Sequence, residues 1–180
     1  MHPIKHFITI TKHRHRVMKY CFKCGLYKQG LLHDLSKYSF LEFWLGAKYY
    51  LGTKSPHYKE RLTKGYSDAW MHHKGRNKHH GEYWVDINPD TNLYEAVKMP
   101  DRYLAESLCD RIAASEIYNK KNYKREMVLD YFDNVSSIHE PLHHDTKNKL
   151  RELILMYIEK DKKETFKYIK KNLRGKKATY

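Results

Sequence analysis

The 180-residue chain has few cysteines and no long apolar run, and both scarcities limit what it can be. Its three cysteines are an odd number, which argues against a framework of disulfide bonds. Cys21 and Cys24 form a single C-x-x-C pair, which is weak evidence for zinc, and we expect both to be buried on a helix. No uncharged apolar run approaches the roughly 20 residues that span a bilayer, and the N-terminus lacks the apolar stretch of a signal peptide. We therefore expect a cytoplasmic protein with no membrane partner.

The sequence also lacks internal repeats, low-complexity linkers and convincing strand alternation. Apolar residues at helical spacing instead predict helices nearly throughout. The expected helices cover residues 4–24, 27–37, 100–118, 124–134, 146–160 and 162–173, with shorter ones after Ser39, Ser55 and Ser67. Segment 74–98 is the one long stretch expected as loop, and long polar loops are often functional. The prediction is an all-α single domain over residues 1–180, with residues 146–180 as C-terminal helices packed on it.

Acidic residues are outnumbered, with 21 Asp and Glu against 35 Lys and Arg, a formal charge of +14. This excess attracts anions, and nucleic acid, nucleotides and phosphorylated metabolites are all compatible with it. Part of the charge lies in the lysine-rich segment 160–177, which is also compatible with a solvated helix face. The 16 tyrosines, many beside lysines, suit stacking on single-stranded nucleic acid. No motif of a nucleic-acid-binding fold accompanies them.

Histidine, in contrast, is abundant, and most of the 13 histidines gather at a few points in the sequence. Histidine is the commonest metal ligand and titrates near neutral pH. On the first predicted helix, His13 shares a face with Val17 and Cys21, whereas His15 lies about 200° away. We therefore expect His13 to point inward and His15 outward. The groups are 13/15, 33, 72/73, 79/80 and 139/143/144, of which the last lies in a proline-containing loop and is expected at the surface.

The pair His33-Asp34 is the candidate centre of a metal site. Two ligands do not hold a catalytic metal, so further inward-facing ligands are needed. His13 is one candidate. Asp110 is another, because its predicted helix face carries small residues and a buried aspartate is costly unless paired or metal-bound. A salt bridge to a lysine or arginine is the alternative for Asp110.

Taken together, the order H…HD…D resembles that of the HD-domain metal-dependent phosphohydrolases. The run His33-Asp34-Leu35-Ser36-Lys37 is similar to the HD-x-x-K form of that superfamily, the segment 13–17 resembles its first-helix histidine, and the segment 110–113 resembles its closing aspartate. More narrowly, segments 30–38, 72–80 and 109–115 resemble those of an uncharacterised family of small HD-like proteins. That resemblance covers most of the chain and brings no known substrate.

The resemblance implies an HD-domain-like helical bundle that hydrolyses a phosphomonoester, a nucleotide or a similar anion. It implies a divalent metal held by His13, His33, Asp34 and Asp110. These ligand types permit manganese, iron, nickel, cobalt or zinc. His73 and His79 are candidate ligands of a second ion, although a one-metal site is equally compatible. The candidate catalytic residues are Asp34, Lys37 and His73, and the candidate substrate-binding residues are Lys37, His72, Arg76, Lys78, His80 and Arg111.

Several of these residues also have ordinary structural interpretations. Lys37 follows His33 by four residues, which predicts the same helix face, but a solvated lysine near a helix end is equally compatible. Ser39 and Glu42 form a capping box that by itself explains Glu42. Arg76, Lys78, Arg102 and Arg111 are surface cations of a kind that usually binds nothing. The alternative function is a non-catalytic basic module that binds nucleic acid or nucleotide on an HD-like scaffold.

Overall fold

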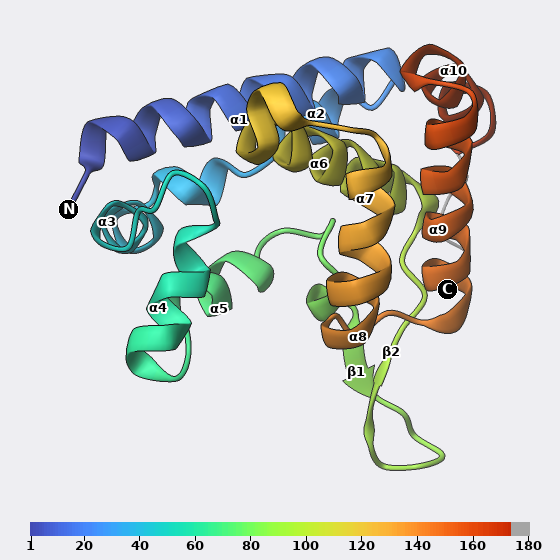
Figure 1. Ribbon diagram of the computed structural model, residues 1–180. Helices are drawn as coiled ribbons and strands as arrows, with labels where there is room; N and C mark the ends of the chain where they lie inside the picture. Colours follow the sequence, from blue (N-terminus) through green and yellow to red (C-terminus); the bar gives the residue numbers. More distant parts are fainter. Residues whose placement is uncertain (174–180) are drawn as a thin grey trace.

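The long helices α1 (Pro3–Lys23) and α6 (Asp101–Asn119) pack against each other and form the centre of the molecule (Figure 1). The computed structural model describes residues 1–173. Pro3 occupies the first turn of α1, where its missing N–H is not needed. Gly25, with φ of 74°, follows the C-terminal end of α1 in the left-handed conformation that favours glycine. The packing of α1 against α6 confirms the prediction of an all-α fold, and α1 itself corresponds to the helix predicted over residues 4–24.

The remaining helices form two groups, of which the first lies mostly toward the N-terminal end of α1 and the second toward its C-terminal end (Figure 1). The first group follows α1 in the sequence: α2 (Tyr27–Leu32), α3 (Phe40–Lys48), α4 (Pro56–Lys64) and α5 (Asp68–Lys74). The second group follows α6: α7 (Glu126–Tyr131), α8 (Ser137–His139), α9 (His144–Glu159) and α10 (Lys162–Asn172). Within residues 1–173, no helix combines the length and apolar character needed to cross a membrane.

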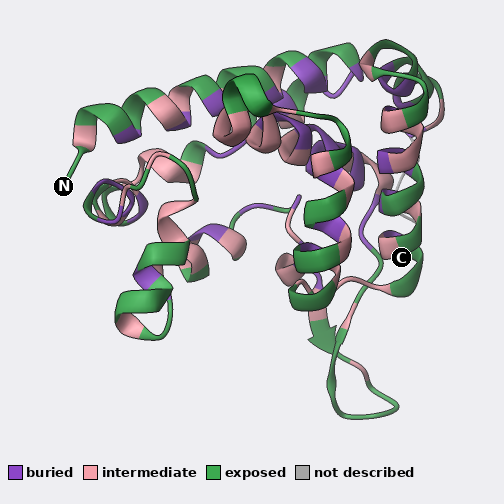
Figure 2. Ribbon diagram, viewed as in Figure 1, coloured by how far each residue is buried: buried purple, intermediate pink, exposed green. Residues whose placement is uncertain are grey.

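Side chains from α1, α6, α9 and α10 form the main hydrophobic core (Figure 2). Cys21, Cys24 and Cys109 are all buried there as free thiols, which confirms that the C-x-x-C pair behaves as small apolar residues. Helices α9 and α10 contribute Ile154, Tyr157, Phe166 and Ile169 to this core. The predicted C-terminal helices therefore pack on the centre of the fold, and only residues 174–180 lie outside the described residues.

The helix predicted over residues 27–37 was wrong beyond Leu32. Helix α2 ends there, His33 and Asp34 form a turn, and a short 3₁₀ helix follows at Leu35–Tyr38. Asp34 has φ of 54°, in the left-handed region that aspartate tolerates better than most residues. The prediction that Lys37 shares a helix face with His33 was wrong for the same reason. Helix 124–134 also differs, because a π-helical turn at Phe132–Ser136 separates α7 from α8.

Segment 86–98 was predicted as loop, but it contains most of a small hairpin. Strands β1 (Val85–Ile87) and β2 (Tyr94–Ala96) pair antiparallel, with Val85 opposite Ala96 and Ile87 opposite Tyr94. Three-residue strands are too short to show an alternation of apolar and polar residues, so the sequence pattern did not reveal them. The hairpin projects from the helical body (Figure 1) and its side chains are mostly exposed.

Replacing Gly46 on α3 with alanine is expected to destabilise the packing of α3 against α1. A Cβ atom at this position would lie 2.3 Å from Nε2 of the buried His6 side chain on α1. Overpacking of this kind costs about 1–3 kcal/mol. Denaturant unfolding should therefore show a lower free energy for Gly46→Ala. The control Gly75→Ala, where the nearest contact is 3.5 Å, should unfold like the wild type; equal losses in both variants would contradict close packing at Gly46.

Candidate metal centre

The turn at His33-Asp34 lies at the middle of a cluster of histidines and acids. Because the helix breaks here, the two adjacent side chains need not point about 100° apart as they would on a regular helix. His33 and Asp34 are both buried. Left-handed backbone at a non-glycine residue is commonly found at functional sites, where the surrounding structure holds it. The turn therefore directs an imidazole and a carboxylate to one point.

His13, His33, Asp34 and Asp110 come together as a first group of possible metal ligands, with one atom of each lying within 4.8 Å of the others. His13 Nε2 lies 2.8 Å from Asp110 Oδ1 and 3.6 Å from Asp34 Oδ2. His33 Nε2 lies 3.4 Å from Asp34 Oδ2 and 3.6 Å from Asp110 Oδ1. As expected from helical phase, His13 points inward from α1. The four predicted ligands of the first ion thus face one another.

A second group, formed by Asp34, His73, His79 and His80, uses the other oxygen of the same aspartate. Asp34 Oδ1 lies 3.4 Å from His73 Nε2 and 3.6 Å from His79 Nε2. His80 Nε2 lies 3.0 Å from His73 Nε2. His73 comes from α5, and the other two histidines come from the polar loop that follows it. The Asp34 carboxylate therefore stands between two groups of ligands, with Oδ2 facing the first and Oδ1 the second.

Several atoms in these groups are buried without a hydrogen-bond partner among the described residues. They are His13 Nε2, His33 Nε2, His79 Nε2 and both oxygens of Asp34. Asp34 Oδ2 and His13 Nε2 do have ion-pair partners, Lys37 Nζ at 2.6 Å and Asp110 Oδ1 at 2.8 Å. Leaving a buried polar atom unpaired costs about 1–3 kcal/mol, so the other three atoms still need a partner. Imidazole nitrogen and carboxylate oxygen are ligands of divalent transition metals. The cluster fits one or two such ions.

Two buried glutamates contact the Nδ1 atoms of the candidate ligand histidines, on the side of each ring away from Asp34. Glu106 Oε1 lies 2.9 Å from His33 Nδ1 and 3.2 Å from His79 Nδ1. Glu42 Oε2 lies 2.9 Å from His73 Nδ1. A carboxylate that accepts the Nδ1 proton leaves Nε2 free to bind a metal and fixes the orientation of the ring. All three histidines then present Nε2 to Asp34.

Sequence reasoning missed both glutamates as site residues. The capping-box interpretation of Glu42 was half right, because Ser39 Oγ does accept a hydrogen bond from the Glu42 backbone N–H. The Glu42 carboxylate does not reach back to Ser39, however; it contacts His72 and His73. Glu106 lies four residues before Asp110 on α6, and this i, i+4 spacing of two acids on a helix with many small residues was the available signal.

Electrostatics favour ionised carboxylates at the centre of the cluster. Burial alone would raise the pKa of Asp34, but the charges of His33 and Lys37 hold it well below its usual range. Burial likewise opposes ionisation of Asp110, and contacts with His13 and His33 lower its pKa well below the usual value. Burial lowers the pKa of His80, so this imidazole is neutral at pH 7. Burial would also lower the pKa of His33, but the neighbouring carboxylates of Asp34, Asp110 and Glu106 raise it instead, so a metal that binds there would displace a proton. Charged carboxylates and neutral imidazoles are the protonation states that bind metal.

The candidate substrate-binding residues differ in their distance from this centre. Lys37 is adjacent, with Nζ 2.6 Å from Asp34 Oδ2. His72 Nδ1 lies 2.5 Å from Glu42 Oε1, at the edge of the second group. Arg76 and Lys78 are exposed on the loop after α5. Arg111 contacts Ser136 and Glu140, so its guanidinium is already paired.

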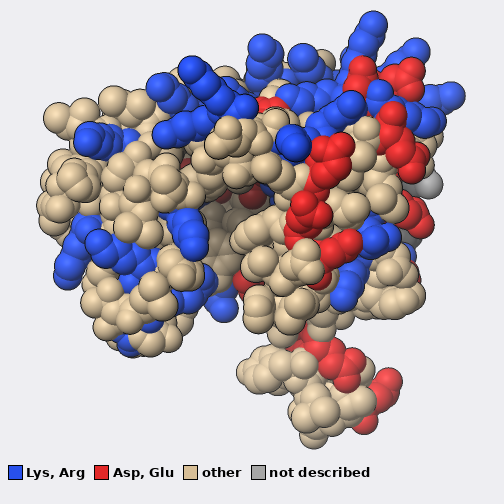
Figure 3. All heavy atoms as spheres, viewed as in Figure 1, with Lys and Arg blue, Asp and Glu red and all other residues tan. Residues whose placement is uncertain are grey.

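In the space-filling view, acidic atoms lie inside a hollow of the molecular surface, and Lys and Arg side chains surround the hollow (Figure 3).

Comparison with known proteins gives one match. A family model described as a family of unknown function (DUF5662) matches residues 2–156, the segment that holds both ligand groups. No protein of curated function and no solved structure matches the chain.

Proposed function

The chain belongs to this family of unknown function, so its activity has to be inferred from its own residues, and we propose that it is a divalent-metal-dependent phosphohydrolase of the HD-domain type. The reaction would split a phosphomonoester with water into an alcohol and inorganic phosphate. The buried clusters of histidines and acids are compatible with a metal ion, and the reaction and the substrate class are what we propose beyond that.

The arrangement of two ligand groups around one shared carboxylate is the observation that carries this proposal. The first ion would bind His13, His33, Asp34 and Asp110, and the second would bind Asp34, His73, His79 and His80. When bound, divalent ions lower the pKa of a coordinated water and offset the charge on phosphoryl oxygens. In this assignment His73 is a ligand and not a general acid.

Residues around the ions would bind and orient the phosphate. The Lys37 ammonium lies beside the shared carboxylate, where it can donate a hydrogen bond to a phosphoryl oxygen of the substrate. Glu106 and Glu42 keep the ligand imidazoles in the orientation that binding requires. Arg76 and Lys78 add positive potential at the surface. We assign Arg111 a structural role, because Glu140 already pairs with it.

A phosphatase panel tests the proposal. Purified protein is treated with chelator, reloaded separately with Mn²⁺, Fe²⁺, Ni²⁺, Co²⁺ or Zn²⁺, and assayed for phosphate release from phosphomonoesters and nucleotides. We expect release with at least one of these ions and its loss on renewed chelation. Protein that holds stoichiometric metal and releases no phosphate from any substrate would contradict the hydrolase.

A second candidate function rests on a basic groove beside α10. The groove has a volume of about 820 Å³. It is lined by Lys23, Arg125, Asp161, Lys162, Lys163, Phe166, Lys167 and Lys170. Lys and Arg side chains gather along the upper edge of the molecule, over α1 and α10 (Figure 3). Such a groove suits the backbone of a nucleic acid, as the alternative of a basic binding module requires.

The double variant Lys163→Glu, Lys167→Glu tests this alternative. If the groove binds single-stranded nucleic acid, affinity should fall linearly with salt on logarithmic axes, by about 0.7 per phosphate contact. The double variant should then weaken binding and reduce that slope by about 1.4. Fluorescence anisotropy with a labelled oligonucleotide measures both. The control Lys59→Glu, on the exposed face of α4, should change neither; equal slopes in all three proteins would exclude the groove.

A further inference from the structure

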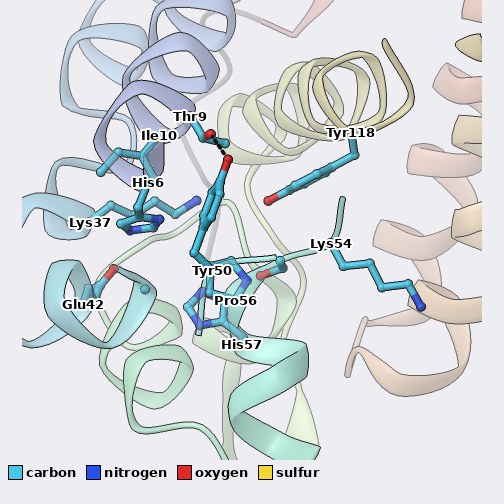
Figure 4. A pocket seen from close by; sticks show the side chains of 12 residues that line it. His6, Thr9, Ile10, Lys37, Glu42, Tyr50, Lys54, Pro56, His57 and Tyr118 are labelled. Atoms are coloured by element: carbon cyan, nitrogen blue, oxygen red, sulfur yellow. Dashed lines mark hydrogen bonds between the residues drawn. The ribbon is translucent and has the colours of Figure 1, made fainter. Parts of the chain in front are cut away.

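A small pocket lies beside the metal centre (Figure 4). Its volume is about 40 Å³. The wall is formed by the first half of α1, by α3, by the segment around His57 and by Tyr118 near the end of α6. Lys37 also lines it. The resemblance to HD phosphohydrolases assigned no role to His6, Tyr50, His57 or Tyr118, although all four line this pocket.

The pocket continues from the ligand cluster along the same two central helices. His6 precedes His13 on α1 by seven residues, which is two turns and the same face. Tyr118 follows Asp110 on α6 by about 12 Å of helix rise, and helical side chains lean toward the N-terminus and so back toward Asp110. Lys37 joins the two sites, because its ammonium pairs with Asp34 and its side chain lines the pocket. The pocket and the ligand cluster therefore share Lys37 as a common wall.

Hydrogen-bond donors dominate the groups that the pocket offers to a ligand. The Tyr50 hydroxyl is already bonded to Thr9 Oγ1 at 2.9 Å, and the Glu42 carboxylate is occupied by His72 and His73. The Tyr118 hydroxyl points into the pocket, and Figure 4 draws no hydrogen bond from it to the other residues of the lining. Burial raises the pKa of Tyr118, so the hydroxyl keeps its proton and can donate it. Tyr118 thus offers a hydrogen-bond donor on the wall opposite Lys37.

The size of the pocket limits what it can receive. A water molecule needs about 10–15 Å³ of such volume, so the pocket has room for about three waters or a short polar chain. Pockets for drug-sized ligands measure about 300–1,000 Å³, and a nucleoside needs a space of that order. The pocket therefore fits a group of a few atoms that carries an oxygen.

We propose that this pocket binds the leaving alcohol of a small phosphomonoester and that the Tyr118 hydroxyl donates a hydrogen bond to an oxygen of that alcohol. The substrate class is then a phosphorylated short-chain polyol or hydroxy acid, with its phosphoryl group at the ions and its free oxygen at Tyr118. The inference rests on the proposed phosphohydrolase function. A nucleoside is too large for this pocket, so a nucleotide cannot place its leaving group there.

Three phosphate esters test the inference in the metal-loaded protein. Glycerol 1-phosphate and n-propyl phosphate have leaving groups of similar length that differ in their free hydroxyls, and methyl phosphate has no further oxygen for Tyr118 to contact. We expect wild-type kcat/KM to be about tenfold or more higher for glycerol phosphate than for propyl phosphate, because a polar site rejects an analogue that lacks its hydrogen bond. Tyr118→Phe should abolish that preference and leave methyl phosphate unaffected.

The controls separate this inference from the function on which it rests. Tyr131→Phe, on the exposed face of α7, should keep the wild-type preference. Metal content should be equal in wild type and Tyr118→Phe, which distinguishes a lost hydrogen bond from a damaged centre. Hydrolysis of all three esters with the same preference in both proteins would overturn the pocket assignment alone. No hydrolysis of any ester by metal-loaded wild type would overturn the proposed function and this inference with it.

Discussion

Asp34→Asn is expected to abolish both metal binding and phosphate release. Asp34 is the one residue that belongs to both ligand groups, with Oδ2 facing His13 and His33 and Oδ1 facing His73 and His79. An amide keeps the size of the side chain but removes the charge and one of the two acceptor oxygens. Each ion therefore loses its shared ligand. We expect no stoichiometric metal in the variant and phosphatase activity at least about 1,000-fold below that of the wild type.

Thermal unfolding gives a second measurement of the same loss, independent of activity. A metal ion at 100 times its Kd stabilises a protein by about 2.7 kcal/mol, so chelation should lower the Tm of the wild type. Asp34→Asn should unfold at the same temperature with and without chelator. The control Asp130→Asn changes an exposed aspartate of α7 and should keep the response of the wild type. A chelator-sensitive Tm in Asp34→Asn would show that the ion binds elsewhere.

Glu106→Leu is expected to weaken the binding of both ions without removing any of their proposed ligands. Glu106 accepts from the Nδ1 atoms of His33 and His79, one histidine from each group. Loss of such a positioning carboxylate usually lowers metal affinity about 10- to 100-fold. The conservative Glu106→Gln keeps an acceptor oxygen and should restore part of the affinity. Calorimetric titration of the chelated proteins with Mn²⁺ measures these changes.

A matched variant, Glu42→Leu, removes the carboxylate that supports a histidine of the second group. This carboxylate contacts His73 of the second group and no ligand of the first, so Glu42→Leu should weaken only one of the two binding steps. Glu126→Leu, at an exposed position of α7, should leave both steps unchanged. If Glu106→Leu and Glu42→Leu gave identical titrations, Glu42 would not act on the second ion alone.

The inward positions of His13 and Asp110 in the first group could be predicted from the sequence because they depend on helical phase. Regular spacing on α1 separated the inward His13 from the exposed His15, and the small residues of α6 marked the face of Asp110. The convergence of His33 and Asp34 could not be predicted, because it depends on a left-handed residue that ends α2. Periodicity continued that helix to residue 37, since nothing in the apolar pattern marks the break.

The second group and the supporting glutamates depend on long-range packing. His79 and His80 lie in a loop, where no periodicity tells which side chain points inward. Glu42 is 31 residues from His73, and Glu106 is 73 residues from His33. A local capping pattern accounted for Glu42 in the sequence, yet its carboxylate contacts His73 in the fold. Local rules explain the backbone N–H of such a residue and leave its buried side chain undetermined.

A crystal of the Mn²⁺-loaded protein, with anomalous diffraction recorded, would locate the bound ions themselves. We expect two anomalous peaks on opposite sides of the Asp34 carboxylate. One peak should lie among His13, His33 and Asp110, and the other among His73, His79 and His80. Full-occupancy peaks at other residues, or no peak beside Asp34 in crystals grown with excess metal, would contradict this arrangement.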